Sequence, residues 1–174
     1  MDLATQALVN ECKRQEESCL YTSTSLFEWL KALRSWRRVL ITTPIILSAI
    51  ATSAIIKQYS HYEWIAGVSA LLAGILPAVL KALELDRDLI AIARQAGQFK
   101  VLQDRFRQLW RVGALGDSEG FKRDFKANMK EMDDLRLASS AVPDRFFAKA
   151  QQKIGEGHYD FAVDGKQPEP TSPI

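Results

Sequence analysis

Two stretches of the chain decide its fold. Val39–Ile56 reads VLITTPIILSAIATSAII, and Trp64–Leu80 reads WIAGVSALLAGILPAVL; neither contains a charged side chain. Charged residues make up 25% of the 174-residue chain, so the two stretches stand apart from their surroundings. A helix needs about 17–25 apolar residues to cross a bilayer. We therefore predict an all-α protein built on a transmembrane helical hairpin, with spans at about 39–56 and 64–80.

The basic residues around these stretches predict the orientation of the hairpin. Four precede the first stretch and four follow the second: Lys31, Arg34, Arg37, Arg38, Lys81, Arg87, Arg94 and Lys100. The link between the stretches contains only Lys57. Because the excess of Lys and Arg marks the cytoplasmic side, we expect both termini to be cytoplasmic.

A helical bundle with two buried helices is the alternative to a membrane hairpin, because both stretches are short for a span. A soluble helix usually keeps a polar stripe, however, and here only Ser and Thr could form one. The absence of charges inside the stretches also disfavours a proton-coupled transporter.

Small residues recur at helical spacing in both stretches. Ser48 belongs to such a stripe in the first stretch, and one face of the second contains Gly67, Ala70, Gly74 and Ala78. Small faces let helices approach closely in lipid. They would either pack the two spans of one chain together or join copies into an oligomer.

The remainder of the chain is predicted to be helical. No Pro or Gly interrupts residues 3–43, so one helix should run into the first span. After the second span, apolar residues follow a mean period of about 3.5, typical of a coiled-coil seam: Leu85, Leu89, Ile92, Ala96, Phe99, Phe106 and Trp110. The short link predicts an antiparallel cytoplasmic stalk in which the numbers of facing residues sum to about 121, so that Trp29 lies near Ile92.

The same register predicts a collar of charges where the stalk meets the membrane. Arg34 and Arg37 should lie near Glu84 and Asp86. Exposed ion pairs contribute only about 0–1 kcal/mol each, so the collar would set the register more than the stability.

Two short helices are predicted beyond the stalk. One should cover about 119–139, capped by Asp117 or Ser118, and the other should begin at Pro143 and end at Gly155. Both should fold back against the stalk. Residues 1–155 would then form a single domain, and the Gly- and Pro-containing segment 156–174 a disordered tail.

The sequence contains no pattern of residues that is typical of catalysis or metal binding. His61, His158, Cys12 and Cys19 have no metal-ligand spacing, and no nucleophile or nucleotide-binding motif occurs. We expect a non-enzyme without cofactor or metal, and free thiols in a reducing compartment. The net charge of +2, without a basic tail, disfavours direct nucleic-acid binding. Trp110 with Arg105, Arg107 and Arg111 would either hold a phosphate or form a charged outer face.

A family resemblance adds to this interpretation. The basic, aromatic lead-in Leu33–Arg38, the two spans and the segment Leu89–Leu102, with its Ala-x-x-x-Gly-x-Phe-x-x-Leu pattern, resemble the SLATT domains. The helix that begins at Val142-Pro143 also fits. The resemblance covers about 21–154.

The resemblance implies a function. SLATT domains are two-span bacterial effectors that accompany nucleotide-second-messenger synthetases, sensors or reverse transcriptases and perforate or depolarise the membrane in conflict with phage. It implies a multi-pass protein of the bacterial inner membrane that forms homo-oligomers and receives its signal from such a partner. Polar positions near a pore would be Thr42, Thr43, Thr52, Ser53 and Ser69. The alternative function is a non-conducting membrane anchor that recruits a soluble partner.

Overall fold

The computed structural model describes residues 3–56, 63–82 and 85–159, without the side chains at 51, 53–56, 63, 65–66, 80, 82 and 85–86. Every regular element within these ranges is helical, which confirms the all-α prediction. The elements are α1 (Leu3–Ile56), α2 (Glu63–Ala82), α3 (Leu85–Arg111), the 3₁₀ turn η2 (Gly113–Leu115), α4 (Ser118–Ala138) and α5 (Asp144–Gly155).

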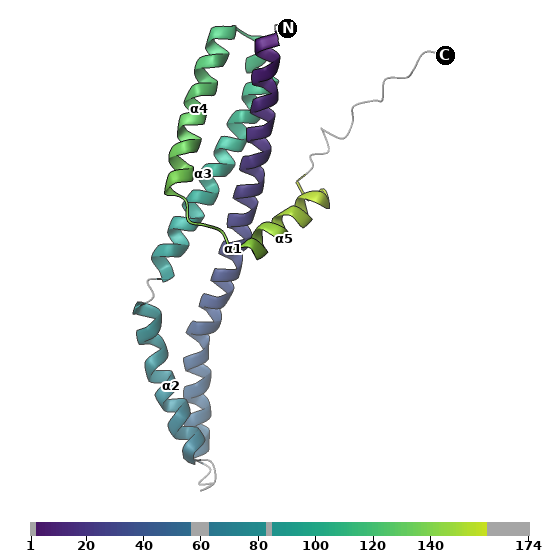
Figure 1. Ribbon diagram of the computed structural model, residues 1–174. Helices are drawn as coiled ribbons and strands as arrows, with labels where there is room; N and C mark the ends of the chain where they lie inside the picture. The colour runs from purple at the N-terminus through teal and green to yellow at the C-terminus, as the bar shows by residue number, and fades with distance from the viewer. Residues whose placement is uncertain (1–2, 57–62, 83–84, 160–174) are drawn as a thin grey trace, which may run out of the picture.

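Helix α1 organises the molecule. Its 54 residues run without interruption through Pro44, as predicted. Figure 1 shows α2 beside the C-terminal part of α1 and α3 beside the N-terminal part, with α4 along the outside of the α1–α3 pair. The chain returns antiparallel along α1, first as α2 and then as α3.

The stalk core lies between α1 and α3. Leu26 and Leu30 of α1 are buried there, and five residues of the predicted α3 seam belong to the same core: Leu89, Ile92, Ala96, Phe99 and Phe106. Leu102 and Leu109 are buried beside them, whereas Trp110 of the predicted seam is half-buried and the Leu85 side chain lies outside the described residues. Figure 1 shows α3 running antiparallel beside α1 over this length. The regular spacing of large apolar residues therefore positions the two helices.

The register of this pair is close to the predicted one. Trp29 and Ile92 line one small pocket, as expected. Farther from the hairpin, Lys13 lies 4.8 Å from the Trp110 ring centroid, where the prediction places Gln108. The register therefore differs by two residues at the far end of the stalk.

Helix α4 covers α3 through an apolar face. The side-chain Oδ2 of Asp117 accepts a hydrogen bond from the Gly120 backbone N–H at 3.0 Å, which makes Asp117 the N-cap. The buried side chains are Phe121, Met132 and Leu135. The predicted helix and its cap are thus confirmed, and the bounds differ by one residue at each end.

Helix α5 leaves this layer and packs on α1. Pro143 is its N-cap residue, and Phe146 and Ala150 are buried. Phe147 is 44% exposed, and its ring lies 6.1 Å from that of Tyr21 of α1. The helix ends at Gly155 as predicted. The disordered tail was predicted for 156–174, which is wrong for 156–159: these residues form turns in which the Gly157 and His158 N–H groups donate to carbonyls of α5. The rest of the predicted tail, 160–174, falls outside the described residues.

Both cysteines belong to the stalk core. Cys12 and Cys19 are free and fully buried. Burial raises the pKa of the Cys12 thiol to about 11 and that of the Cys19 thiol to about 12. Their thiolate forms, which are the nucleophiles, are therefore scarce at neutral pH.

We expect neither thiol to react with iodoacetamide at pH 8 while the stalk is folded. Both should be alkylated in denaturant, and the mass of the intact protein would count the adducts. Rapid labelling of Cys19 in the folded chain would contradict its burial beneath α4, where its Sγ lies 4.0 Å from the sulfur of Met132.

Candidate functional site: the uncharged hairpin and its basic junction

The two uncharged stretches pack together as helices. Ser69 of α2 is buried, and the half-buried side chains nearby are Leu40, Thr43, Pro44, Leu47, Ala73 and Leu76. These residues mark one narrow face on each helix. The opposite faces are exposed and apolar: Ile45 and Ile46 of α1 and Leu71 of α2 are 58–66% exposed.

The small-residue faces are on the outside of this hairpin. Gly67, Ala70, Gly74 and Ala78 are all exposed, and a Cβ atom built on either glycine would meet nothing within 4 Å. Ser48 of α1 is exposed as well. Within one chain, these residues do not pack the two helices together.

The hydroxyl groups proposed for a pore are mostly bonded within their own helix. Thr42 donates to the Arg38 carbonyl at 3.0 Å, and Thr43 to the Val39 carbonyl at 2.7 Å. Thr52 likewise donates to the Ser48 carbonyl at 2.8 Å, and Ser48 to the Ile45 carbonyl at 2.8 Å. Ser69 is buried in the hairpin, and the Ser53 side chain is outside the described residues. No observation tests these positions as a pore lining.

The described parts of the helices give no support to a membrane crossing. None of them is both long enough and apolar enough to span a bilayer. In the first stretch, the structure describes the side chains of 39–50 and Thr52. In the second stretch, it describes those of Trp64 and 67–79, and Lys81 follows this stretch. The two spans therefore stay a prediction from the sequence.

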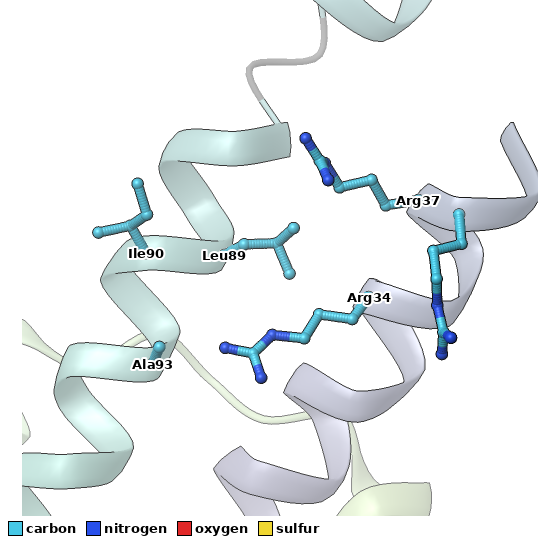
Figure 2. A pocket seen from close by; sticks show the side chains of 6 residues that line it. Arg34, Arg37, Leu89, Ile90 and Ala93 are labelled. Atoms are coloured by element: carbon cyan, nitrogen blue, oxygen red, sulfur yellow. The ribbon is translucent and has the colours of Figure 1, made fainter. Parts of the chain in front are cut away.

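A basic pocket lies where the charged stalk meets the uncharged hairpin. It has a volume of about 720 Å³ between α1 and α3 and is lined by Arg34, Arg37, Arg38, Leu89, Ile90 and Ala93. Figure 2 shows Arg34 and Arg37 extending from α1 across the opening toward α3, with Leu89 and Ala93 on the opposite wall. The pocket therefore has one cationic and one apolar side.

The predicted collar involves the same arginines. Its acidic partners are Glu84 and Asp86, and both side chains lie outside the described residues. The collar therefore stays a prediction. Arg34 and Arg37 do lie at the junction where it was expected.

A second charged site joins α5 to α1, and the sequence did not reveal it. The side chain of Glu28 is only 1% exposed, and Nζ of both Lys31 and Lys153 lies 2.7 Å from its Oε1. Lys149 Nζ is 3.0 Å from Oε2, as an ion pair without hydrogen-bond geometry. One carboxylate of α1 thus holds two lysines of α5.

The electrostatics of this cluster favour the ionised carboxylate. Burial raises the pKa of Glu28, but contacts with Lys153, Lys31 and Lys149 together outweigh burial and lower the pKa from 4.5 to about 2. The hydrogen bond to Glu28 raises the pKa of Lys153 in return. Glu28 and Lys153 are therefore both charged at neutral pH.

The third charged group surrounds Trp110. Glu16 accepts hydrogen bonds from Arg107 Nε at 2.7 Å and from Trp110 Nε1 at 2.6 Å. Arg105 pairs with Glu131 of α4, and Arg111 lies over the Trp110 ring. Since carboxylates already pair with Arg105 and Arg107, this group joins helices, in keeping with the charged-face alternative.

No metal-binding cluster was found in the part of the chain that the structure describes, where no three His, Cys, Asp or Glu side chains gather suitably. Searches against protein-family models, curated proteins and solved structures gave no match to this chain. The SLATT resemblance consequently remains a prediction from the sequence.

Proposed function

We propose that this protein is a membrane effector of a bacterial antiphage system. Its uncharged helices insert as a hairpin into the inner membrane with both termini cytoplasmic, and copies assemble through the small-residue faces. A nucleotide signal or a partner protein acting on the cytoplasmic helices changes the assembly and opens a pore. The protein has no catalytic role in this proposal.

The exposed apolar surface of the hairpin carries the proposal. Soluble monomers rarely expose contiguous apolar patches of more than a few hundred Å², yet both helices here present large apolar side chains outward: Ile41, Ile45, Ile46, Ile50, Val68, Leu71, Leu72, Ile75 and Val79. In lipid these side chains need no protein cover. The intrahelical hydroxyl bonds of Thr42, Thr43 and Thr52 also suit a medium without water.

The open glycines support assembly of copies. At 100° per residue, the small-residue face of α2 is turned about 125° away from the side that carries Ser69 and Ala73. Leucine at Gly67 and Gly74 would therefore fit the single chain but keep neighbouring copies apart.

The test uses the full chain in vesicles that contain a potassium-sensitive dye. We expect the unaltered chain to stay with the vesicles after a carbonate wash and to release potassium when the trigger, a nucleotide second messenger or the partner protein, is added. Gly67→Leu with Gly74→Leu should keep the chain in the membrane, reduce its mass in detergent to that of a monomer and abolish the leak. Val68→Leu with Val79→Leu, exposed on the side of the same helix, is the control that should leak normally. A chain removed by the wash would overturn the membrane proposal.

The anchor function has one observation in its favour. Ser69 is buried and the described hydroxyls bond to their own helix, which leaves few polar groups for an aqueous lumen. Replacing both stretches with leucine-rich helices separates the two functions. An anchor would still hold its partner at the membrane, whereas a pore would no longer conduct.

A further inference from the structure

The basic pocket concentrates positive charge at one point. Arg34, Arg37 and Arg38 lie within five residues of α1, and no acidic residue is among the described residues that line the pocket. Arg37 makes a further interaction of its own, which leaves Arg34 and Arg38 as the two cations for a ligand. Both of these side chains are exposed, and neither has an ion-pair partner in the described ranges.

Arginine at such a place favours a phosphate ligand. The guanidinium group is planar and donates two parallel hydrogen bonds to phosphate or carboxylate oxygens. Figure 2 shows Arg34 directed across the pocket, so an anion there would lie between the two helices. A pocket of about 720 Å³ is large enough for more than a bare ion.

The opposite wall of the pocket is apolar. Leu89 and Ala93 line it, and Ile90 is 71% exposed, which is unusual for an isoleucine beside a packed core. The uncharged stretch begins immediately after Arg38, where Val39 is 51% exposed. Cationic and apolar groups thus meet at the boundary between the stalk and the hairpin, as an amphiphilic ligand requires.

We propose that this pocket binds the phosphate group of an anionic phospholipid. Arg34 and Arg38 pair with the phosphate oxygens, and Leu89, Ile90 and Ala93 contact the first methylene groups of the acyl chains. The inference rests on the proposed membrane location, which puts the Arg38–Val39 boundary at headgroup depth. Basic pockets between helices at this depth suit acidic headgroups.

Lipid retention measured by native mass spectrometry tests the pocket. The full chain would be purified in detergent with equal amounts of phosphatidylglycerol and phosphatidylcholine. We expect it to retain phosphatidylglycerol preferentially, and Arg34→Gln with Arg38→Gln to lower that preference about tenfold, the effect of losing a charge-assisted pairing. Arg14→Gln with Arg123→Gln removes the same charge from side chains that are 78% and 81% exposed on the stalk and α4, and should retain the preference.

The other outcomes separate the two proposals. Equal retention of both lipids by a chain that still stays in washed vesicles would overturn the pocket assignment alone. Loss of the unaltered chain from the vesicles would overturn the membrane proposal itself. Displacement of phosphatidylglycerol by millimolar inorganic phosphate or a nucleoside monophosphate would assign the pocket to a soluble phosphate compound and overturn the lipid.

Discussion

Replacing Glu28 with glutamine is expected to release α5 from α1. The change leaves Lys31, Lys149 and Lys153 close together without their shared carboxylate. The pKa shift of Glu28 to about 2 corresponds to about 2–3 kcal/mol, after allowing for solvent around the exposed lysines. Because a helix of 12 residues is marginal alone, α5 should unfold once it is released.

Hydrogen exchange measures this release directly. Amide protection in α5 should fall about 100-fold in Glu28→Gln, whereas protection in the α1–α3 core should stay close to normal. Glu119→Gln breaks an exposed pair with Lys122 and should change little, since its side chain is 80% exposed. Unchanged protection of α5 in the Glu28 variant would refute the role assigned to this carboxylate.

The same cluster predicts a dependence on pH. Because the folded-state pKa of Glu28 lies below its ordinary value of 4.5, its contribution is present above that value and is lost as the pH falls toward about 2. We expect α5 of the unaltered chain to loosen over this window, as followed by Tyr and Trp fluorescence or by exchange. The Glu28→Gln variant should show no such transition there.

Replacing Phe106 with alanine is expected to have the largest effect on the stability of the stalk. This side chain of α3 is fully buried in the stalk core, and its ring meets that of Phe125 of α4 edge-on at 6.3 Å. Truncation of a buried Phe costs about 3–5 kcal/mol, because it removes apolar burial and leaves a cavity. Urea unfolding followed by circular dichroism of the full chain in detergent should show a lower midpoint.

Phe27→Ala is the matched control for this substitution. Phe27 is on α1 and 36% exposed, so its loss should cost much less than that of Phe106. If the two variants unfolded at the same urea concentration, the α3–α4 contact would not contribute as the packing implies. Refolding at reduced temperature would show whether the Phe106 variant still reaches the helical state.

Sequence periodicity was a good guide to the stalk. The apolar positions of α3 repeat at about 3.5 residues over most of its length. Such a repeat puts the apolar side chains on a single face of the helix, and this face packs against the partner helix. The two-residue difference in register lies where polar contacts join the helices. Glu16 binds Arg107 and Trp110 together, and a pattern of apolar residues contains no information about such a contact.

The burial of α1 was harder to predict. Ser23, Thr24, Ser25 and Leu26 are four consecutive buried residues, so other helices surround α1 there. Ser25 donates to the Tyr21 carbonyl at 2.7 Å, and this intrahelical bond makes burial of a hydroxyl inexpensive. In the sequence, however, Ser and Thr look like a solvent-facing side.

Of the two charged candidate sites, the sequence predicted the basic junction but not the Glu28 cluster. Arg34 and Arg37 were expected at the junction because three arginines next to an uncharged stretch are visible in the sequence. Glu28 was missed because a single Glu in a polar segment is ordinary, and its two partners in α5 are over 100 residues away. Only Lys149 and Lys153, four residues apart on one face of α5, hinted at an acidic partner.

The unbroken course of α1 has a mechanical consequence. With a rise of 1.5 Å per residue, its 54 residues form a rod about 80 Å long, whereas the returning chain is divided into α2 and α3. Glu28 is 11 residues before Val39, or about 16 Å along this rod. A rotation or displacement of α1 where α5 is attached would therefore be transmitted to the hairpin through continuous helix, because no break in the helix lies in between.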